Sequence, residues 1–306
     1  MIDIIIPAYN AFDTITQTLQ SIAKQINHSD VSVYIINDGS SDSYSSIIKN
    51  FQNVINITEI IIQNSGPGVA RQVGIDSSSN EYLLFMDADD RLYDEHSLLN
   101  LINIIKDADL AQGKFIEMQD GNSKVLDPQY CYLHGKLYRR SFIKKNNLFF
   151  DPTRRYNGDV YEDSTFNQLY CLYCDKIATT DEIIYIYEYN PNSITKTEYI
   201  NADINHLKNF VDAMTWLMKE IKKRKIEKRY EIAWNIYIIC FHIYFKYLQS
   251  INGYDSIFED MKIIKEMYEE YQSDLPYAEQ FSIYQLFSDY QIIPTITFYD
   301  FIRKVH

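Results

Sequence analysis

The sequence contains little cysteine. Its four cysteines in 306 residues are too scattered for a disulfide framework: Cys131, Cys171, Cys174 and Cys240. Small secreted domains that depend on disulfides carry a much denser set, so we expect a reducing compartment. Cys171 and Cys174 have half of a zinc-binding spacing, but no second cysteine or histidine pair lies near them in the sequence. We interpret both as core residues.

Long apolar runs are also lacking. The best stretch, Ile232–Leu248, is interrupted by Asn235, His242 and Lys246, whereas a membrane span needs about 20 nearly uncharged residues. The chain starts directly with the apolar Ile2–Ile6, without the basic start of a secretory signal. These features predict a cytoplasmic protein.

Basic residues are outnumbered by acidic ones. Lys and Arg total 29, Asp and Glu total 42, and the net charge is −13. A general nucleic-acid-binding protein needs a basic face that displaces counterions, so we expect no nucleic-acid partner. Aromatic residues, in contrast, are abundant, with 27 tyrosines. Tyrosine suits wet grooves and sugar faces, although a biased genome composition explains the number equally well.

The first 110 residues alternate between short apolar runs and amphipathic stretches. The apolar runs predict buried strands at 2–6, 31–36, 57–62 and 82–86. The stretches between them predict helices within 12–26, 42–51 and 69–77. Strand and helix in alternation, with short connections, imply right-handed crossovers. We therefore expect an α/β fold with a mostly parallel sheet flanked by helices.

The remainder of the chain is less regular and then becomes helical. Two paired strands, a helix and a further strand are predicted at 113–118 with 124–126, 164–176 and 183–189. From about residue 200 onward the pattern is helical throughout. We divide the chain into domain 1–199 and an all-helical C-terminal region, 200–306.

In parallel sheets ligands bind beyond the carboxyl ends of the strands. No glycine precedes Gly39, so the first strand lacks the glycine fingerprint of a dinucleotide site. Asp38, before Gly39, can accept hydrogen bonds from a pyrimidine ring or cap the next helix. Arg71, at the start of a predicted helix after Gly66 and Gly68, suits an anion such as diphosphate or is a surface residue.

Two acidic segments carry the most chemistry. Asp87-Ala88-Asp89-Asp90 places three carboxylates at the end of a buried strand, where they repel one another unless a cation neutralises them. In an extended chain Asp87 and Asp89 point to one side, and their oxygens suit Mg²⁺ or Mn²⁺. Glu162 and Asp163 precede a predicted helix. They act as a general base with an acidic neighbour or simply complement the helix dipole.

Taken in order, six segments of the chain resemble the family 2 glycosyltransferases, which have the GT-A nucleotide-sugar fold. The segments are Ile4–Asn10, Asn37–Ser40, Gly68–Ile75, Asp87–Asp90, His134–Arg140 and Glu162–Asp163. The resemblance covers about residues 1–195, and the ordered set is far more specific than each piece. Residues 200–306 match nothing that we can name.

The resemblance implies a role for each matched position. The residues implied in donor binding are Pro7, Tyr9, Asp38, Arg71, Asp87 and Ala88, with Asp38 reading the uracil ring. Asp87 and Asp89 would hold Mn²⁺ or Mg²⁺ on the diphosphate of a UDP-sugar. Asp163 would be the catalytic base with Glu162 as its neighbour, and His134–Arg140 would shape the acceptor side. His134 stands where many relatives carry tryptophan, which puts acceptor stacking by this residue in doubt.

The implied reaction is a single inverting displacement onto a glycan or lipid-linked acceptor, as in bacterial surface polysaccharide synthesis. Two alternatives stay open: a non-catalytic nucleotide-sugar-binding partner subunit and, less favoured, a sugar nucleotidyltransferase. A basic cluster at 219–229 precedes aromatic residues up to 248. It predicts peripheral contact with the inner face of a membrane or a solvated helix face, and the aromatic spacing fits a core or a homodimer interface.

Overall fold

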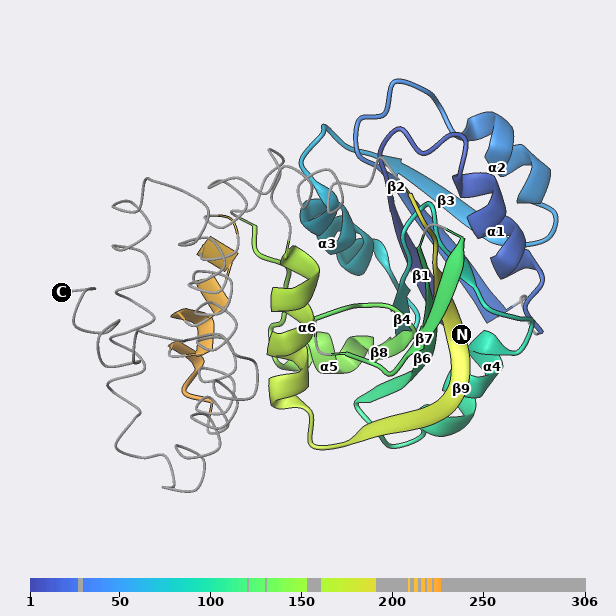
Figure 1. Ribbon diagram of the computed structural model, residues 1–306. Coiled ribbons are helices and arrows are strands. Elements are labelled where there is room, and N and C mark those ends of the chain that lie inside the picture. The colour runs from blue at the N-terminus through green and yellow to red at the C-terminus, as the bar shows by residue number, and fades with distance from the viewer. Residues whose placement is uncertain are drawn as a thin grey trace, which may run out of the picture. The chain divides into compact units, whose positions relative to one another are not determined.

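The protein is described as a computed structural model (Figure 1). The described residues are 1–26, 30–119, 121–129, 131–152 and 161–190, followed by scattered positions between 209 and 226. The chain divides into two compact units, Met1–Thr197 and Glu198–His306. The division of the sequence at 199/200 into two functional domains stays a prediction.

The described part of the first unit forms one sheet with helices on both faces. Its strands are β1 Ile2–Ala8, β2 Val31–Asn37, β3 Asn56–Ile61, β4 Tyr82–Phe85, β5 Arg91–Leu92, β6 Leu110–Gln119, β7 Asn122–Leu126, β8 Lys136–Arg139 and β9 Ile177–Tyr187. Its helices are α1 Ile15–Ala23, α2 Ser45–Phe51, α3 Pro67–Ser77, α4 Ser97–Ile105, α5 Arg140–Lys145 and α6 Glu162–Tyr173. The α/β class predicted from the sequence is confirmed.

The strand order is β3-β2-β1-β4-β8-β6-β9-β5, with β7 paired to β6. The first four of these strands are parallel, as the alternating pattern predicts. Beyond β4 the sheet is mixed, because β8 runs antiparallel to both β4 and β6 while β6 and β9 are parallel. The expectation of a mostly parallel sheet is therefore wrong for this half. The predicted pairing of 113–118 with 124–126 is confirmed by the β6–β7 hairpin.

Successive side chains of a strand point to opposite faces of its sheet, and helices cover both faces of the sheet around β1 (Figure 1). Helices α1, α2 and α4 cover one face, where Ile4 and Ile6 lie in a core cluster with Leu19 of α1 and Leu101 of α4. Helices α3, α5 and α6 cover the other face. There Gly74 leaves room for Ile5, whose side chain would lie 2.3 Å from an added Cβ atom. Both faces of β1 are thus buried, which explains its continuous apolar run.

Strand β1 extends two residues beyond the predicted Ile2–Ile6, and Pro7 determines what lies beside its end. The carbonyl oxygen of Ile5 accepts the N–H of Met86, and that of Ala8 accepts the N–H of Asp38. The backbone polar groups of successive residues in β1 point alternately toward β4 and β2. The backbone nitrogen of Pro7 therefore faces β4, where it has no N–H to donate. The β1–β4 ladder ends there, so the chain after Met86 leaves the sheet. That departing segment is Asp87–Asp90.

In the second unit the described residues between 209 and 224 are helical. Ala213, Leu217 and Ile221 are fully buried and recur every four residues, the spacing of one apolar helix stripe. The helices predicted farther along, and nearly all of the basic and aromatic stretch 219–248, lie outside the described residues. Within the described part of the chain, no helix has the length and apolar character required to cross a membrane.

Candidate active site

Asp38, directly after β2, anchors the loop that leads into α3. Its two carboxylate oxygens accept the N–H groups of Ser65 at 2.7 Å and Gly66 at 2.8 Å. Burial raises the pKa of Asp38, and these two amides oppose the rise. Gly66 has a φ of 90°, which few residues other than glycine adopt. Asp38 therefore holds the loop before α3 and does not cap the next helix along the chain, α2. Recognition of a uracil ring by Asp38 stays a prediction.

Arg71, in the second turn of α3, connects the two acidic segments. Its Nη2 donates to Asp87 Oδ1 at 2.7 Å, and its Nη1 donates to Glu162 Oε1 at 2.6 Å. The Arg71 and Glu162 side chains are 6% and 8% exposed. An added Cβ at Gly68 would lie 3.0 Å from Glu162 Cγ, so this glycine makes room for α6. The side chain of Glu162 therefore fills the space beside Gly68.

The Arg71 guanidinium is charged although it is buried. Burial lowers its pKa, but the nearby carboxylates of Asp87, Glu162 and Asp163 outweigh this effect and the net shift is upward. The guanidinium carbon lies 5.9 Å from the centre of the Phe150 ring. Its Nε has no hydrogen-bond partner among the described residues. Arg71 thus retains one donor while it neutralises two carboxylates.

The segment Asp87–Asp90 is a turn, because the N–H of Asp90 donates to the carbonyl of Asp87 at 3.2 Å. The premise of an extended chain, on which the shared orientation of Asp87 and Asp89 rested, is therefore wrong. Asp89 Oδ2 instead accepts a hydrogen bond from Asn190 Nδ2 at 2.7 Å. The turn is fixed from α1 by Thr18, whose hydroxyl donates to the carbonyls of Ala88 and Asp90.

The three carboxylates of this turn have different environments. Burial raises the pKa of Asp87, but the charge of Arg71 outweighs it and the net pKa is lowered. Burial and the neighbouring charges raise the pKa of Asp89, and they raise that of Asp90 well above the ordinary value. Asp90 accepts the Tyr185 hydroxyl at 2.7 Å and the N–H of Glu188 at 2.9 Å. The turn therefore stores negative charge that one arginine only partly offsets.

His134, just before β8, completes a cluster that fits a divalent cation. One ring nitrogen and carboxylate oxygens of Asp87 and Asp90 all lie within 4.8 Å of one another. His134 is 8% exposed, and its Nδ1 has no hydrogen-bond partner among the described residues. Burial lowers the pKa of His134 to about 4, so the imidazole is neutral at physiological pH. A neutral nitrogen beside two carboxylates is a plausible ligand set for a metal.

The His134 ring lies between tyrosines. It stacks on Tyr132, Tyr185 and Tyr187 with ring centres 4.9–5.3 Å apart and interplanar angles of 7–21°. These neighbours cover the faces of the imidazole, which agrees with the doubt that His134 stacks on an acceptor sugar. Sequence reasoning missed His134 and Asp90 as partners in one cluster. Their separation by 44 positions gives no local signal, and only the turn and the β8 pairing bring them together.

Asp163 lies half-buried in the first turn of α6, beside the Arg71 bridge. Burial and the charge of Glu162 raise its pKa to about 7, and Arg71 opposes that rise. Its Oδ1 accepts the N–H of Ser164 at 2.7 Å. A carboxylate with a pKa near neutrality can accept and release a proton at physiological pH. The adjacent Glu162 is buried and engaged with Arg71, a different environment from that of Asp163.

The other predicted donor-binding residues lie around the same sheet edge. Pro7 is in β1, Tyr9 follows it and is 44% exposed, and Ala88 is buried in the acidic turn. The structure therefore brings these residues to the carboxyl ends of β1 and β4. Their contacts with a nucleotide stay predictions.

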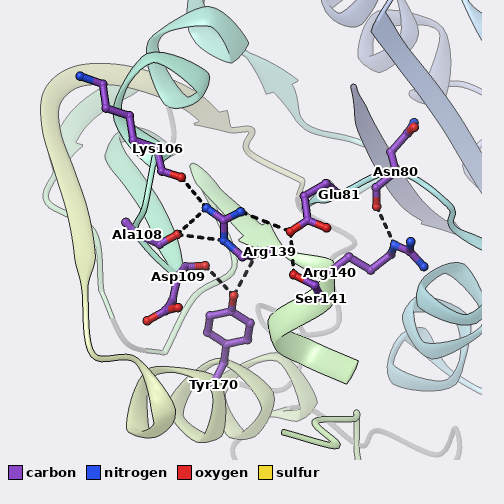
Figure 2. A network of polar contacts seen from close by, with 9 residues as sticks. All are labelled: Asn80, Glu81, Lys106, Ala108, Asp109, Arg139, Arg140, Ser141 and Tyr170. Atoms are coloured by element: carbon purple, nitrogen blue, oxygen red, sulfur yellow. Dashed lines mark hydrogen bonds and ion pairs between the residues drawn. The ribbon is translucent and has the colours of Figure 1, made fainter. Parts of the chain in front are cut away.

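Arg139 and Arg140, at the end of the matched segment His134–Arg140, have structural partners (Figure 2). Arg139 donates to the carbonyls of Lys106 and Ala108 and pairs with Glu81. Arg140 donates to the carbonyl of Asn80 at 2.6 Å. These contacts tie the end of β8 to the loops beside β4 and α4. Within His134–Arg140, His134 thus lies at the acidic turn, whereas Arg139 and Arg140 hold neighbouring loops in place.

The family model described as "Glycosyl transferase family 2" matches residues 3–156. Among curated proteins, the chain is 28% identical over 233 residues to "Uncharacterized glycosyltransferase EpsJ" of Bacillus subtilis, covering 68% of this chain and 66% of that protein. It is 27% identical over 252 residues to "Poly(ribitol-phosphate) beta-glucosyltransferase" of Bacillus spizizenii, covering 76% and 38%. The chain thus spans less than two thirds of the length of either relative.

Among solved structures, residues 1–349 of Staphylococcus aureus TarS in complex with UDP-GlcNAc have the same fold. The TM-score is 0.59 at 22% sequence identity, and the match covers 72% of this chain and 66% of that one. The GT-A fold expected from the resemblance is confirmed.

Proposed function

Since the chain belongs to glycosyl transferase family 2, we propose that it is an inverting glycosyltransferase that moves a sugar from a UDP-sugar to a glycan or lipid-linked acceptor. One observation carries the proposal: Arg71 contacts both Asp87 and Glu162, so one side chain joins the donor-side acids to the segment of the candidate base. Separate acidic patches on a surface would lack such a buried bridge. TarS, which shares the fold, is described in complex with UDP-GlcNAc, and this supports a UDP-sugar as donor.

In the proposed reaction Asp163 accepts the proton of the acceptor hydroxyl while that oxygen attacks the anomeric carbon. The bond from the anomeric carbon to the diphosphate oxygen breaks, and UDP leaves with the electron pair. Glu162 holds the proton affinity of Asp163 high by charge repulsion. Arg71 fixes Glu162 and Asp87 at the two sides of the site.

A divalent cation, Mn²⁺ or Mg²⁺, bound at the acidic turn would stabilise the negative charge that develops on the departing diphosphate. Asp87 is the ligand expected from both the sequence and the geometry. The sequence adds Asp89 and the cluster adds Asp90 as candidates. Calorimetry of UDP binding with Mn²⁺ in Asp89→Ala and Asp90→Asn separates these two, because loss of metal-dependent affinity identifies the ligand.

The function is tested by measuring UDP release from a panel of UDP-sugars, with Mn²⁺, with Mg²⁺ and with EDTA. We expect release from at least one donor that EDTA abolishes and that Asp163→Asn reduces strongly. UDP binding without release from any donor, even with acceptor glycans added, would favour the alternative of a partner subunit. Release that is unaffected by EDTA would refute the metal requirement.

The proposed acceptor suggests a location. A lipid-linked acceptor would lie at the inner face of the membrane, and the basic residues of 219–229 would contact anionic lipid there. Because part of this segment and the aromatic residues that follow it lie outside the described residues, the membrane contact, the cytoplasmic location and the homodimer stay proposals. Flotation with vesicles of anionic lipid tests the first, since a chain that stays unbound refutes it.

A further inference from the structure

His134 combines two properties that seldom occur together in a finished protein core. It is more than nine-tenths buried, and its Nδ1 has no hydrogen-bond partner among the residues described. A buried polar atom left unpaired destabilises the folded protein, because it has lost its hydrogen bonds to water. A phenylalanine at position 134 would fill the aromatic stack without leaving a nitrogen unpaired. The nitrogen therefore calls for a partner that the described part of the chain does not supply.

The position of the imidazole identifies the chemistry of that partner. In the cluster, one ring nitrogen of His134 lies beside the carboxylates of Asp87 and Asp90, which are acceptors only when ionised. A neutral imidazole and two carboxylates converge within 4.8 Å, and all three offer electron pairs. A species that accepts electron pairs satisfies all three at once. A divalent cation does so, and it also offsets the repulsion within the turn.

We propose that His134 is a protein ligand of the divalent cation, so that Asp87, Asp90 and His134 form a mixed carboxylate–imidazole set. The inference rests on the proposed function for the presence of a cation at this turn. It goes beyond it by adding a nitrogen ligand from the segment before β8 to a site expected to consist of carboxylates alone. It also assigns a purpose to the buried imidazole.

Tyr185 supports this arrangement from β9. Its hydroxyl donates to Asp90 Oδ2 and accepts the N–H of Asp87, while its ring stacks on His134 with an interplanar angle of 9°. One side chain therefore orients all three members of the cluster. Partners that hold metal ligands in place in this manner are a regular feature of metal sites. Asp90 remains able to bind a cation, because a carboxylate has about four lone-pair sites and two hydrogen bonds occupy only two of them.

The nitrogen ligand predicts a metal preference. Oxygen-only sites suit Mg²⁺, whereas an imidazole shifts the preference toward transition metals such as Mn²⁺ and Co²⁺. We therefore expect the wild-type protein to prefer Mn²⁺ over Mg²⁺ and His134→Gln to lose most of this preference. The affinity for Mn²⁺ should fall about tenfold or more in this variant.

The decisive experiment reads the nitrogen directly. Mn²⁺ is added to the full chain in the presence of UDP, and electron spin-echo envelope modulation reports any ¹⁴N bound to the metal. We expect modulation in the wild type, its loss in His134→Gln and its retention in His96→Gln. His96 is an exposed histidine before α4 and serves as the matched control.

The wild-type measurement needs no substitution, so an unfolded variant cannot hide the answer. Bound Mn²⁺ without ¹⁴N modulation overturns the proposal, as does modulation that persists in a folded His134→Gln. Failure of the wild type to bind Mn²⁺ overturns it as well. UDP release in the absence of modulation removes His134 alone and leaves the proposed function intact. Modulation without release from any donor supports His134 as a ligand and refutes the transferase.

Discussion

The two acidic segments joined by Arg71 use the same residue types in opposite ways. In the turn Asp87–Asp90 the carboxylate paired with Arg71 is only part of a larger negative cluster, which Tyr185 and His134 surround. At the start of α6 the paired carboxylate is Glu162, and its neighbour Asp163 is half-buried with a pKa raised to about 7. The turn gathers negative charge, whereas at the start of α6 the pKa of one carboxyl group, that of Asp163, is raised.

The difference follows from what each segment lacks. The turn has more negative charge than Arg71 can balance, a deficit that a cation can fill. Asp163 has one backbone amide on its carboxylate and a like charge beside it, conditions that favour the protonated form. Substitutions at each segment should therefore fail in distinguishable ways.

The largest effect is expected from Asp163→Asn. Because asparagine cannot accept the acceptor proton, turnover should fall by about 10²–10⁴-fold, the usual contribution of a general base. UDP affinity, measured by calorimetry with Mn²⁺, should remain near that of the wild type. Asp76→Asn, a change at an exposed carboxylate of α3, is the matched control and should leave both quantities unchanged. A turnover rate equal to the wild type would exclude Asp163 as the base.

Next in size is the loss of stability in Arg71→Ala, which breaks the bridge between the segments. Two carboxylates lose their cation, one of them only 8% exposed, and the free energy of unfolding at pH 7 should drop by about 3–5 kcal/mol. Urea unfolding measures it. Arg91→Ala removes an arginine that is 43% exposed from its pair with Glu188 and should cost about 0–1 kcal/mol. Equal losses in the two variants would contradict the structural role of Arg71.

Sequence patterns predicted the half of the fold that is built locally. Strands β1, β2 and β4 are largely buried and appear as short apolar runs, whereas β3 is partly exposed. Amphipathic stretches separate these first four strands, which pair in parallel. Strand β8 and helix α5 were missed because the apolar residues of Lys136–Arg139 are few and a turn does not separate it from Arg140. Strand β9 begins at Ile177, six residues earlier than predicted, since its first half carries polar residues and pairs in a shifted register with β6.

The candidate site divides along similar lines. The acidic turn and the Glu162–Asp163 pair are contiguous in the sequence, so their residue types alone indicated chemistry. The partners of those acids are not contiguous: Arg71 reaches 91 positions to Glu162, and Tyr185 reaches 95 positions to Asp90. Nothing local in the sequence distinguishes Asp89 from Asp90. Asp89 and Asp90 have different neighbours because the chain turns at Asp87–Asp90, whereas the sequence argument assumed an extended chain there.

A smaller effect is expected from Tyr185→Phe, which affects only the turn. Asp90 loses a hydrogen bond to a charged group and the N–H of Asp87 loses its acceptor, so stability should fall by about 1.5–3 kcal/mol. The ring remains and continues to stack on His134. Tyr93→Phe, at a tyrosine that is 43% exposed, should change the free energy of unfolding by less than about 0.5 kcal/mol. If Tyr185→Phe behaved like this control, the hydroxyl would not hold the turn.

The finest distinction between the segments lies in the pH dependence of turnover. Because Asp163 must be deprotonated to act as a base, the rate should rise with pH around its pKa of about 7. Glu162→Gln removes a like charge that raises this pKa, so the midpoint should move below 7. Asp90→Asn removes a charge that does not contribute to the shift of Asp163, so it should lower the rate without moving the midpoint.

The same raised pKa affects stability with a defined sign. The folded protein keeps a proton on Asp163 between the ordinary carboxyl pKa of 3.8 and about 7, whereas the unfolded chain has released it. Stability contributed by this group is therefore lost as the pH rises through that window. Asp163→Asn should lose less stability than the wild type between pH 4 and 7 in urea unfolding. A parallel decline in both proteins would show that the proton affinity attributed to Asp163 resides elsewhere, and the contrast between the two segments would disappear with it.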